Sequence, residues 1–145
     1  MKKLLLIISS IMQIIVNSFV FYVAIENCIK NIYEEIKPSV DRAMVVSATP
    51  IFIFITVIVG LITIPLITSS VDTLYNLKKN SLSKEVCSKN IKRNKISSII
   101  IVLFTLFAFF LIDDTSVLLL LTLLILPIVN ILLLQKEKNI SWIKG

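Results

Sequence analysis

Four long apolar runs contain no Lys, Arg, Asp or Glu, and each is 17 to 22 residues long. They cover residues 4–25, 50–68, 96–112 and 117–134. A helix of this length crosses a hydrocarbon core about 30 Å thick, whereas a membrane-spanning strand needs only about ten residues of alternating polarity. The runs therefore predict an all-α, polytopic membrane protein whose four transmembrane helices form an antiparallel bundle.

The overall composition agrees with lipid as the solvent for much of the chain. Hydrophobic residues make up 57% of its 145 residues, more than a soluble domain of this size can bury. We expect a single membrane domain over residues 1–145. Its two longer connections are an external loop at 26–49 and a cytoplasmic basic loop at 69–95.

Positive charge concentrates on one side of the predicted spans. The two termini and the 69–95 loop carry 12 of the 15 basic residues and three acidic ones, a net charge of +9. The other two connections carry three basic and six acidic residues, a net charge of −3. Because cytoplasmic segments are enriched in Lys and Arg, both termini and the basic loop are predicted to be cytoplasmic.

The lysine-rich stretch at 77–97 has no aromatic residue among its basic ones, which argues against a nucleic-acid partner. Its charges instead indicate orientation and contact with the anionic headgroups of a lipid bilayer. The richness in Lys, Ile and Asn is typical of an AT-rich bacterial genome, so the expected location is the bacterial cytoplasmic membrane.

The first span has a second interpretation, because Lys2 and Lys3 before an apolar run are also typical of a secretory signal peptide. Two features favour a retained helix. The run is longer than a typical signal-peptide core, and Tyr22 stands where a small residue is expected if cleavage followed Ala24. Cleavage is kept as the alternative, and it would leave three spans.

The segment after the first span has helical periodicity. Isoleucines recur there at positions 25, 29, 32 and 36. The first helix is therefore expected to continue past the lipid and to stop before Pro38. The second helix has two possible starts, an early one capped by Ser39 and a late one capped by Thr49. The extension is expected either to lie on the membrane, which its amphipathic pattern favours, or to dock a partner.

Catalytic chemistry is not indicated by any motif. The chain has no histidine and only two glycines, so the commonest general base and a glycine-rich phosphate loop are both absent from the sequence. Cys28 and Cys87 are predicted on opposite sides of the membrane and therefore as free thiols. Asp113 and Asp114 are expected to cap and solvate a tight turn, because a hard cation needs about six oxygen ligands. We expect no catalytic, metal or cofactor site, and hence no enzyme.

Polar residues inside the predicted spans form two stripes at helical spacing. Ser10, Gln13 and Asn17 make one stripe, and Thr56, Gly60 and Thr63 make a small-residue stripe on the next helix. Asn130 adds a polar point in the fourth span and Thr105 one in the third. Such residues either hold helices together or line a polar path, and the lack of an ionisable group favours helix packing.

If the midpoints of the first two spans lie at the same depth in the bilayer, the stripe residues that face one another can be predicted. This places Asn17 opposite Thr56, Gln13 opposite Gly60, and Ser10 opposite Thr63. In function we expect an accessory, regulatory or immunity-type protein that acts through helix contacts with a larger membrane protein. The alternative is a subunit of an oligomeric small-molecule transporter or efflux protein, in which the partner is a second copy.

Overall fold

The computed structural model describes residues 2–36, 42–112 and 115–143, which form an all-α structure. Its elements are α1 (Lys2–Ile36), α2 (Arg42–Lys78), α3 (Lys84–Ile112), the 3₁₀-helix η1 (Thr115–Leu124) and α4 (Ile125–Ile143). Within these ranges α1, α2, α3 and the continuous η1–α4 segment are each long and apolar enough to cross a membrane. The predicted class and the number of long helices are thus confirmed.

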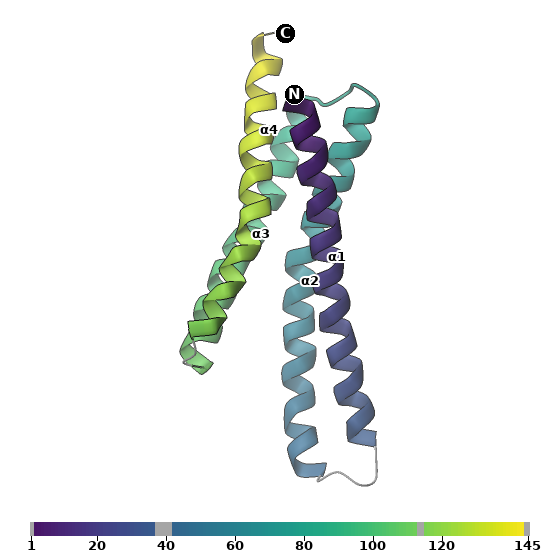
Figure 1. Ribbon diagram of the computed structural model, residues 1–145, viewed down its shortest axis with the longest axis vertical. Helices are drawn as coiled ribbons and strands as arrows, with labels where there is room; N and C mark the ends of the chain where they lie inside the picture. The colour runs from purple at the N-terminus through teal and green to yellow at the C-terminus, as the bar shows by residue number, and fades with distance from the viewer. Residues whose placement is uncertain (1, 37–41, 113–114, 144–145) are drawn as a thin grey trace.

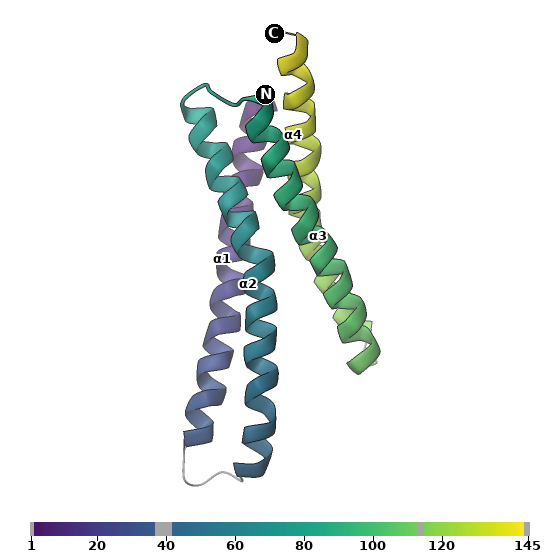
Figure 2. The same cartoon turned by 180° about the vertical axis from the view of Figure 1, so that it is seen from behind.

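The helices associate in two pairs, α1 with α2 and α3 with the η1–α4 segment (Figure 1). The N-terminus, the turn between α2 and α3 and the C-terminus lie at one end of the molecule, where the two pairs meet. Figure 2 shows from behind that the pairs diverge toward the other end. Contacts of α2 with α3 and of α1 with α4 join them.

The segment 69–95, expected as a loop, is helical except for a short turn. Asn80 follows the end of α2 in a left-handed conformation, with φ 52°, and Asn tolerates this conformation better than most residues. Its N–H donates to the Leu77 carbonyl at 3.1 Å, and Ser81 N–H donates to the Asn76 carbonyl at 2.9 Å. These two bonds form a Schellman motif that ends α2. Ser83 then caps α3 by accepting a bond from Val86 N–H at 3.3 Å.

The predicted external loop at 26–49 is also largely helical where it is described. α1 is helical as far as Ile36, which confirms the predicted extension. The predicted stop at Lys37 and Pro38 lies outside the described residues. α2 is helical from Arg42, so the early start is correct and Pro50 lies inside the helix. The proposed cap Ser39 lies outside the described residues. The extension continues beside α2 as part of one long helix (Figure 1).

The span predicted at 117–134 is divided between η1 and α4. Pro127, which is buried, has no N–H to donate to the Leu123 carbonyl, and its ring crowds that carbonyl. The α-helical bonding therefore cannot continue unchanged through this turn. The change from 3₁₀ to α geometry falls at Leu124 and Ile125, next to the interrupted bond.

Candidate functional site: a buried polar core

Buried polar side chains outnumber buried hydrophobic ones in the described part of the chain, by 13 to seven. We call the 13 the polar core: Ser9, Ser10, Gln13, Asn17, Thr63, Ser69, Ser70, Thr73, Asn90, Asn94, Ser97, Thr105 and Asn130. All are uncharged, and large hydrophobic side chains are exposed along every helix. This distribution reverses that of a soluble protein, in which polar residues face the solvent.

Asn94 on α3 connects three helices. Its Oδ1 accepts a hydrogen bond from Gln13 Nε2 on α1 at 2.9 Å. Its Nδ2 donates to Ser69 Oγ on α2 at 2.7 Å and to the Asn90 carbonyl of its own helix at 2.8 Å. The side chain is 1% exposed, so each of these bonds is shielded from water. Asn94 therefore fixes the relative height of α1, α2 and α3 at this level.

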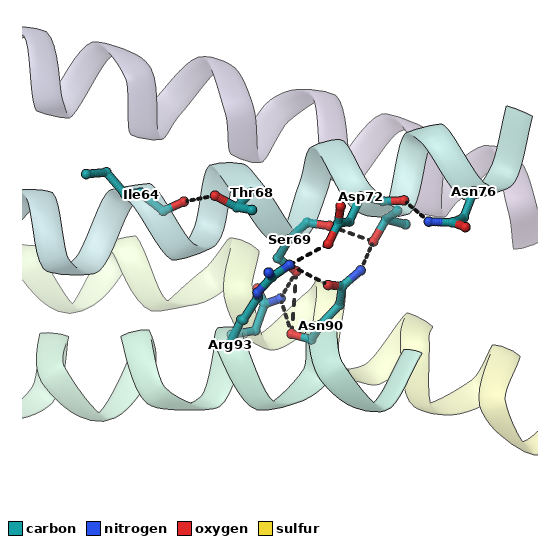
Figure 3. A network of polar contacts seen from close by, with 9 residues as sticks. Ile64, Thr68, Ser69, Asp72, Asn76, Asn90 and Arg93 are labelled. Carbon is teal, nitrogen blue, oxygen red and sulfur yellow. Dashed lines mark hydrogen bonds and ion pairs between the residues drawn. The ribbon is translucent and has the colours of Figure 1, made fainter. Parts of the chain in front are cut away.

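One turn nearer the α2–α3 turn, a second group of bonds joins α2 to α3 (Figure 3). Asn90 Nδ2 donates to Thr73 Oγ1 at 3.0 Å, and Asn90 Oδ1 accepts from Arg93 Nη1 at 3.3 Å. Arg93 also forms an ion pair with Asp72, whose side chain is 39% exposed against 26% for Arg93. This pair is half-exposed and so contributes at most about 1 kcal/mol, but it neutralises two charges beside the buried amides.

α4 reaches the polar core through Asn130. Its Oδ1 accepts a hydrogen bond from Ser9 Oγ, one turn before Gln13 on α1. Asn130 is 2% exposed. All four long helices thus contribute polar groups to the same interior, at the half of the molecule where the two pairs meet.

The polar core retains unused hydrogen-bonding capacity. Within the described residues, four buried side-chain atoms have no partner: Gln13 Oε1, Ser70 Oγ, Ser97 Oγ and Asn130 Nδ2. An unsatisfied buried polar group costs about 1–3 kcal/mol relative to a satisfied one. Of these four atoms, the Gln13 oxygen can accept a hydrogen bond, the Asn130 nitrogen can donate one, and each of the two serine hydroxyls can do both.

The chain matches no known protein family, no curated protein and no solved structure. Its site is accordingly interpreted from its own chemistry.

Metal binding finds no support among the residues that the structure describes, where no three His, Cys, Asp or Glu side chains come together. Asp113 and Asp114 lie outside these residues. Cys28 and Cys87 are free thiols, the first half-buried and the second buried. The chemistry that remains in the interior is hydrogen bonding by neutral amides and hydroxyls.

The residues of the two predicted stripes are mostly interior. Ser10, Gln13, Asn17, Thr63 and Asn130 are each at most 7% exposed. Gly60 is buried as well, and Thr56 is half-buried. α1 and α2 pack along each other, but Gln13 bonds α3 and Asn17 Nδ2 donates to the Gln13 carbonyl of its own helix at 2.7 Å.

The predicted pairing of the two stripes is wrong by about two helical turns. Thr56 Oγ1 donates to the Phe52 carbonyl of its own helix at 2.8 Å and also reaches the Ala24 carbonyl of α1 at 3.3 Å, not Asn17. Gly60 faces Phe21, not Gln13. These partners lie seven and eight residues farther along α1, a displacement of about 10–12 Å. α1 ends at Ile36 and α2 begins at Arg42, so residues equally far from this short connection lie level. The prediction levelled the midpoints of the two apolar runs, and it left out the parts of α1 and α2 that extend beyond these runs.

Several members of the polar core were not predicted from the sequence. Asn90, Asn94 and Ser97 follow the helical spacing i, i+4, i+7, which would have placed them on one face of a helix. The first two were missed because the lysines around them led to the assignment of 69–95 as a loop. Ser69 and Thr73 were missed for the same reason. The spacing of amides within the basic stretch was the available signal.

Proposed function

We propose that this chain is a multi-pass protein of the bacterial cytoplasmic membrane, with antiparallel helices and both termini in the cytoplasm. The interior of neutral polar groups and the apolar exterior support this placement, because a bilayer offers no hydrogen bonds to polar side chains. Exposed lysines supply further support. They belong to the end of α2, the start of α3 and the C-terminal part of α4, all at the end that holds the termini (Figure 1): Lys78, Lys79, Lys84, Lys89, Lys92, Lys95 and Lys136.

We further propose that the protein has no catalytic chemistry and acts as an accessory, regulatory or immunity-type protein through contacts with a larger membrane protein. The observation that supports this proposal is the length of α1 and α2. These helices have 35 and 37 residues, lengths of about 50–55 Å, whereas the hydrocarbon core measures about 30 Å. With the basic end in the cytoplasm, the other end of the pair projects beyond the lipid.

The projecting part of α1 has an exposed apolar stripe. Ile25, Ile29 and Ile32 are 36%, 59% and 38% exposed, and their spacing places them on one face of the helix. A neighbouring face of this segment carries Glu26 and Lys30, which form an ion pair with an N–O distance of 2.8 Å. A row of isoleucines outside the lipid and not covered by α2 is a surface suited to an apolar partner.

The topology can be tested by cysteine labelling, but not with the native thiols. Cys87 is 1% exposed, so its protection from a maleimide would reflect burial and not sidedness. In a background lacking both native cysteines, Asn27→Cys and Ser81→Cys introduce thiols at two exposed positions. In intact cells an impermeant maleimide should label the first and spare the second until the membrane is permeabilised. The reverse pattern would refute the proposed orientation.

The partner surface can be tested by photocrosslinking in living cells. A photoreactive phenylalanine analogue replaces Ile29, and the same analogue at Lys30, on the charged side, is the matched control. We expect an adduct with another membrane protein from Ile29 and little or none from Lys30. Equal adducts, or none from Ile29, would refute a partner on this stripe.

The alternative, a subunit of an oligomeric transporter, rests on the row of polar groups in the bundle interior. Toward the end away from the termini, however, the surface between α2 and the α3–η1 pair is apolar, so the polar groups do not continue through the bundle on that side. The same crosslinking experiment separates the two functions. Adducts between two copies of this chain, with no other protein, would favour the transporter.

A further inference from the structure

A row of exposed lysines runs along the outer face of α3. Lys89, Lys92 and Lys95 follow one another at intervals of three residues, which places them on one side of the helix, and all three are exposed. Asn90 and Asn94 are buried on the opposite side, in the polar core. Figure 2 shows α3 on the near side of the molecule, with no other described helix in front of it. The row is therefore open to whatever surrounds the bundle.

The three lysines carry charge that the protein does not neutralise. Within the described residues no ion pair or hydrogen bond involves their ammonium groups, whereas Arg93 of the same helix is paired with Asp72. The one acidic residue of α3, Glu85, lies one turn from Lys89 toward the α2–α3 turn. The row therefore keeps an excess of positive charge and complements an anionic group.

The hydrogen bonds of the polar core show the height of this row relative to α1. Asn94, the neighbour of Lys95 in the sequence, bonds Gln13, so these parts of α1 and α3 are level. The lysine of α1 nearest to Gln13 is Lys3, ten residues or about 15 Å away toward the end that holds the termini. Residues 4–12 between them are uncharged.

α2 and α4 show a similar offset. Ser69 of α2 is hydrogen-bonded at the same level, and the nearest lysine of α2, Lys78, lies nine residues or about 14 Å beyond it toward the same end. On α4 the first charged residue after Asn130 is Lys136, about 9 Å farther toward that end. In the bilayer placement proposed above, on which this inference rests, Lys95 therefore lies between two and three helical turns deeper than the lysines of α1 and α2.

The apolar run of α3 is too short to cross an undistorted bilayer. The run 96–112 measures about 25 Å, whereas the run 4–25 of α1 measures about 33 Å and the hydrocarbon core about 30 Å. A bilayer thins beside a short apolar segment, and lysine side chains extend toward its headgroups. On the α3 face, cytoplasmic headgroups are therefore drawn toward Lys92 and Lys95.

An exposed apolar stripe continues the lysine row toward the bilayer centre. Ile96, Ile99, Leu103 and Leu106 follow at spacings of three and four residues and are between 46% and 62% exposed. The stripe is about 15 Å long, which is one leaflet of the hydrocarbon core. A lysine row joined to an apolar stripe of this length matches a phosphate headgroup joined to its acyl chains.

We propose that this face of α3 is a binding site for an anionic phospholipid of the cytoplasmic leaflet. The phosphate contacts Lys92 and Lys95, and the acyl chains lie on the apolar stripe at 96–106. The bound headgroup lies deeper in the bilayer than the headgroups beside α1, because these two lysines lie deeper than Lys3.

The site can be tested on the full-length protein in phosphatidylcholine nanodiscs that contain a small fraction of diazirine-bearing phosphatidylglycerol. The matched probe is phosphatidylcholine with the same diazirine-bearing acyl chain. We expect saturable labelling of residues 96–106 by the anionic probe, competed by unlabelled phosphatidylglycerol and not by additional phosphatidylcholine. Equal, non-saturable labelling by both probes would overturn the proposal and leave this face as an ordinary lipid contact.

Lysine-to-glutamine variants separate this row from the other lysines at the same end. Lys92→Gln with Lys95→Gln should weaken the apparent affinity for phosphatidylglycerol roughly 25-fold, about fivefold for each lysine. Lys78→Gln with Lys136→Gln removes the same charge from two exposed lysines outside the row and should change the affinity less than about twofold. Equal effects of the two double variants would overturn the site. Protection of Cys87 from maleimide reports that each variant is folded.

The depth of the headgroup can be measured with nitroxide labels. In the cysteine-free background, Ile96→Cys lies two residues beyond Asn94, and Ile15→Cys lies two residues beyond Gln13, so the two labels are level on exposed faces of α3 and α1. A water-soluble nickel chelate should reach the label on α3 more readily than the label on α1. Equal, lipid-like accessibility of both labels would contradict the drawing of headgroups toward α3.

Photocrosslinking in living cells separates a lipid from a protein occupant. A photoreactive phenylalanine analogue at Ile96 should give adducts with lipid, and an adduct with an acidic segment of another protein would overturn the lipid assignment. The labelling of Asn27→Cys and Ser81→Cys tests membrane placement independently. Correct topology without a preference for phosphatidylglycerol would therefore refute this inference and leave the proposed function standing.

Discussion

Replacement of Asn94 by leucine should destabilise the bundle far more than the loss of one surface amide. The substitution removes two interhelical hydrogen bonds, to Gln13 and to Ser69. Such bonds average about 0.6 kcal/mol each in membrane proteins. It also leaves the Gln13 amide without any partner in the described residues, because Oε1 already has none, at a cost of about 1–3 kcal/mol. We expect a loss of roughly 2–4 kcal/mol in the free energy of unfolding.

A second substitution should partly reverse this loss. Gln13→Leu in the Asn94→Leu background removes the unpartnered amide, and replacing both partners of a buried hydrogen bond by apolar groups is much less costly than removing one. The double variant should therefore be more stable than Asn94→Leu alone, by about 1 kcal/mol or more. Asn31→Leu is the control, because the one bond that Asn31 makes within the described residues goes to the Asn27 carbonyl of its own helix. It should change the free energy of unfolding by less than about 0.5 kcal/mol.

The measurement uses the one buried thiol as a probe. In a Cys28→Ser background, Cys87 is the remaining cysteine and is 1% exposed, so a maleimide reacts with it only when this end of the bundle opens. Titration with sodium dodecyl sulfate in mixed micelles then gives the midpoint of opening for each variant. A double variant no more stable than Asn94→Leu would refute the reasoning, since it would mean that the Gln13 amide was satisfied in some other way.

Two further predictions concern the α1–α2 contact. In a cysteine-free background, Ala24→Cys with Thr56→Cys should form an intramolecular disulfide on mild oxidation. Asn17→Cys with Thr56→Cys should not, because Asn17 lies about 10 Å before Ala24 on α1. Efficient crosslinking of the second pair alone would refute the observed register and support the one predicted from the span midpoints. Gly60→Leu should destabilise the pair by about 1–3 kcal/mol, because even a Cβ at this position would lie 3.3 Å from Phe21 Cε2. In the same detergent titration, Phe21→Ala added to Gly60→Leu should recover part of that loss. If the effects of the two single substitutions on the free energy of unfolding simply added, residues 21 and 60 would not be in contact.

The class of this protein could be predicted from sequence because the signal is continuous and local. Each uncharged apolar run is long enough to require lipid or a very large core, and a chain of 145 residues cannot supply the latter. The helical extension to Ile36 could be predicted for a similar reason, since both the isoleucine spacing and the block at Pro38 are written within a few residues of the chain.

The basic stretch shows where local signals conflict. Lysines around Asn90 and Asn94 indicated a solvated loop, and they do lie exposed on α3. The two asparagines on the same helix face inward, because a helix presents different faces at successive positions. Charge content alone cannot separate a polar loop from a helix with a charged outer face and an amide-lined inner face, whereas the spacing of the amides can.

What the sequence determined by itself was therefore that the polar groups within the apolar runs must be interior, among them Gln13, Asn17 and Asn130, since each is costly to expose to hydrocarbon. What only the tertiary structure decided was the partner of each group. Gln13 bonds Asn94 of α3 and not α2, and Gly60 receives Phe21, because the short connection after Ile36 sets the register of α1 on α2. A polar stripe can hydrogen-bond any neighbour at its height, so its energy is nearly the same in several registers, and the lengths of the connected helices select one.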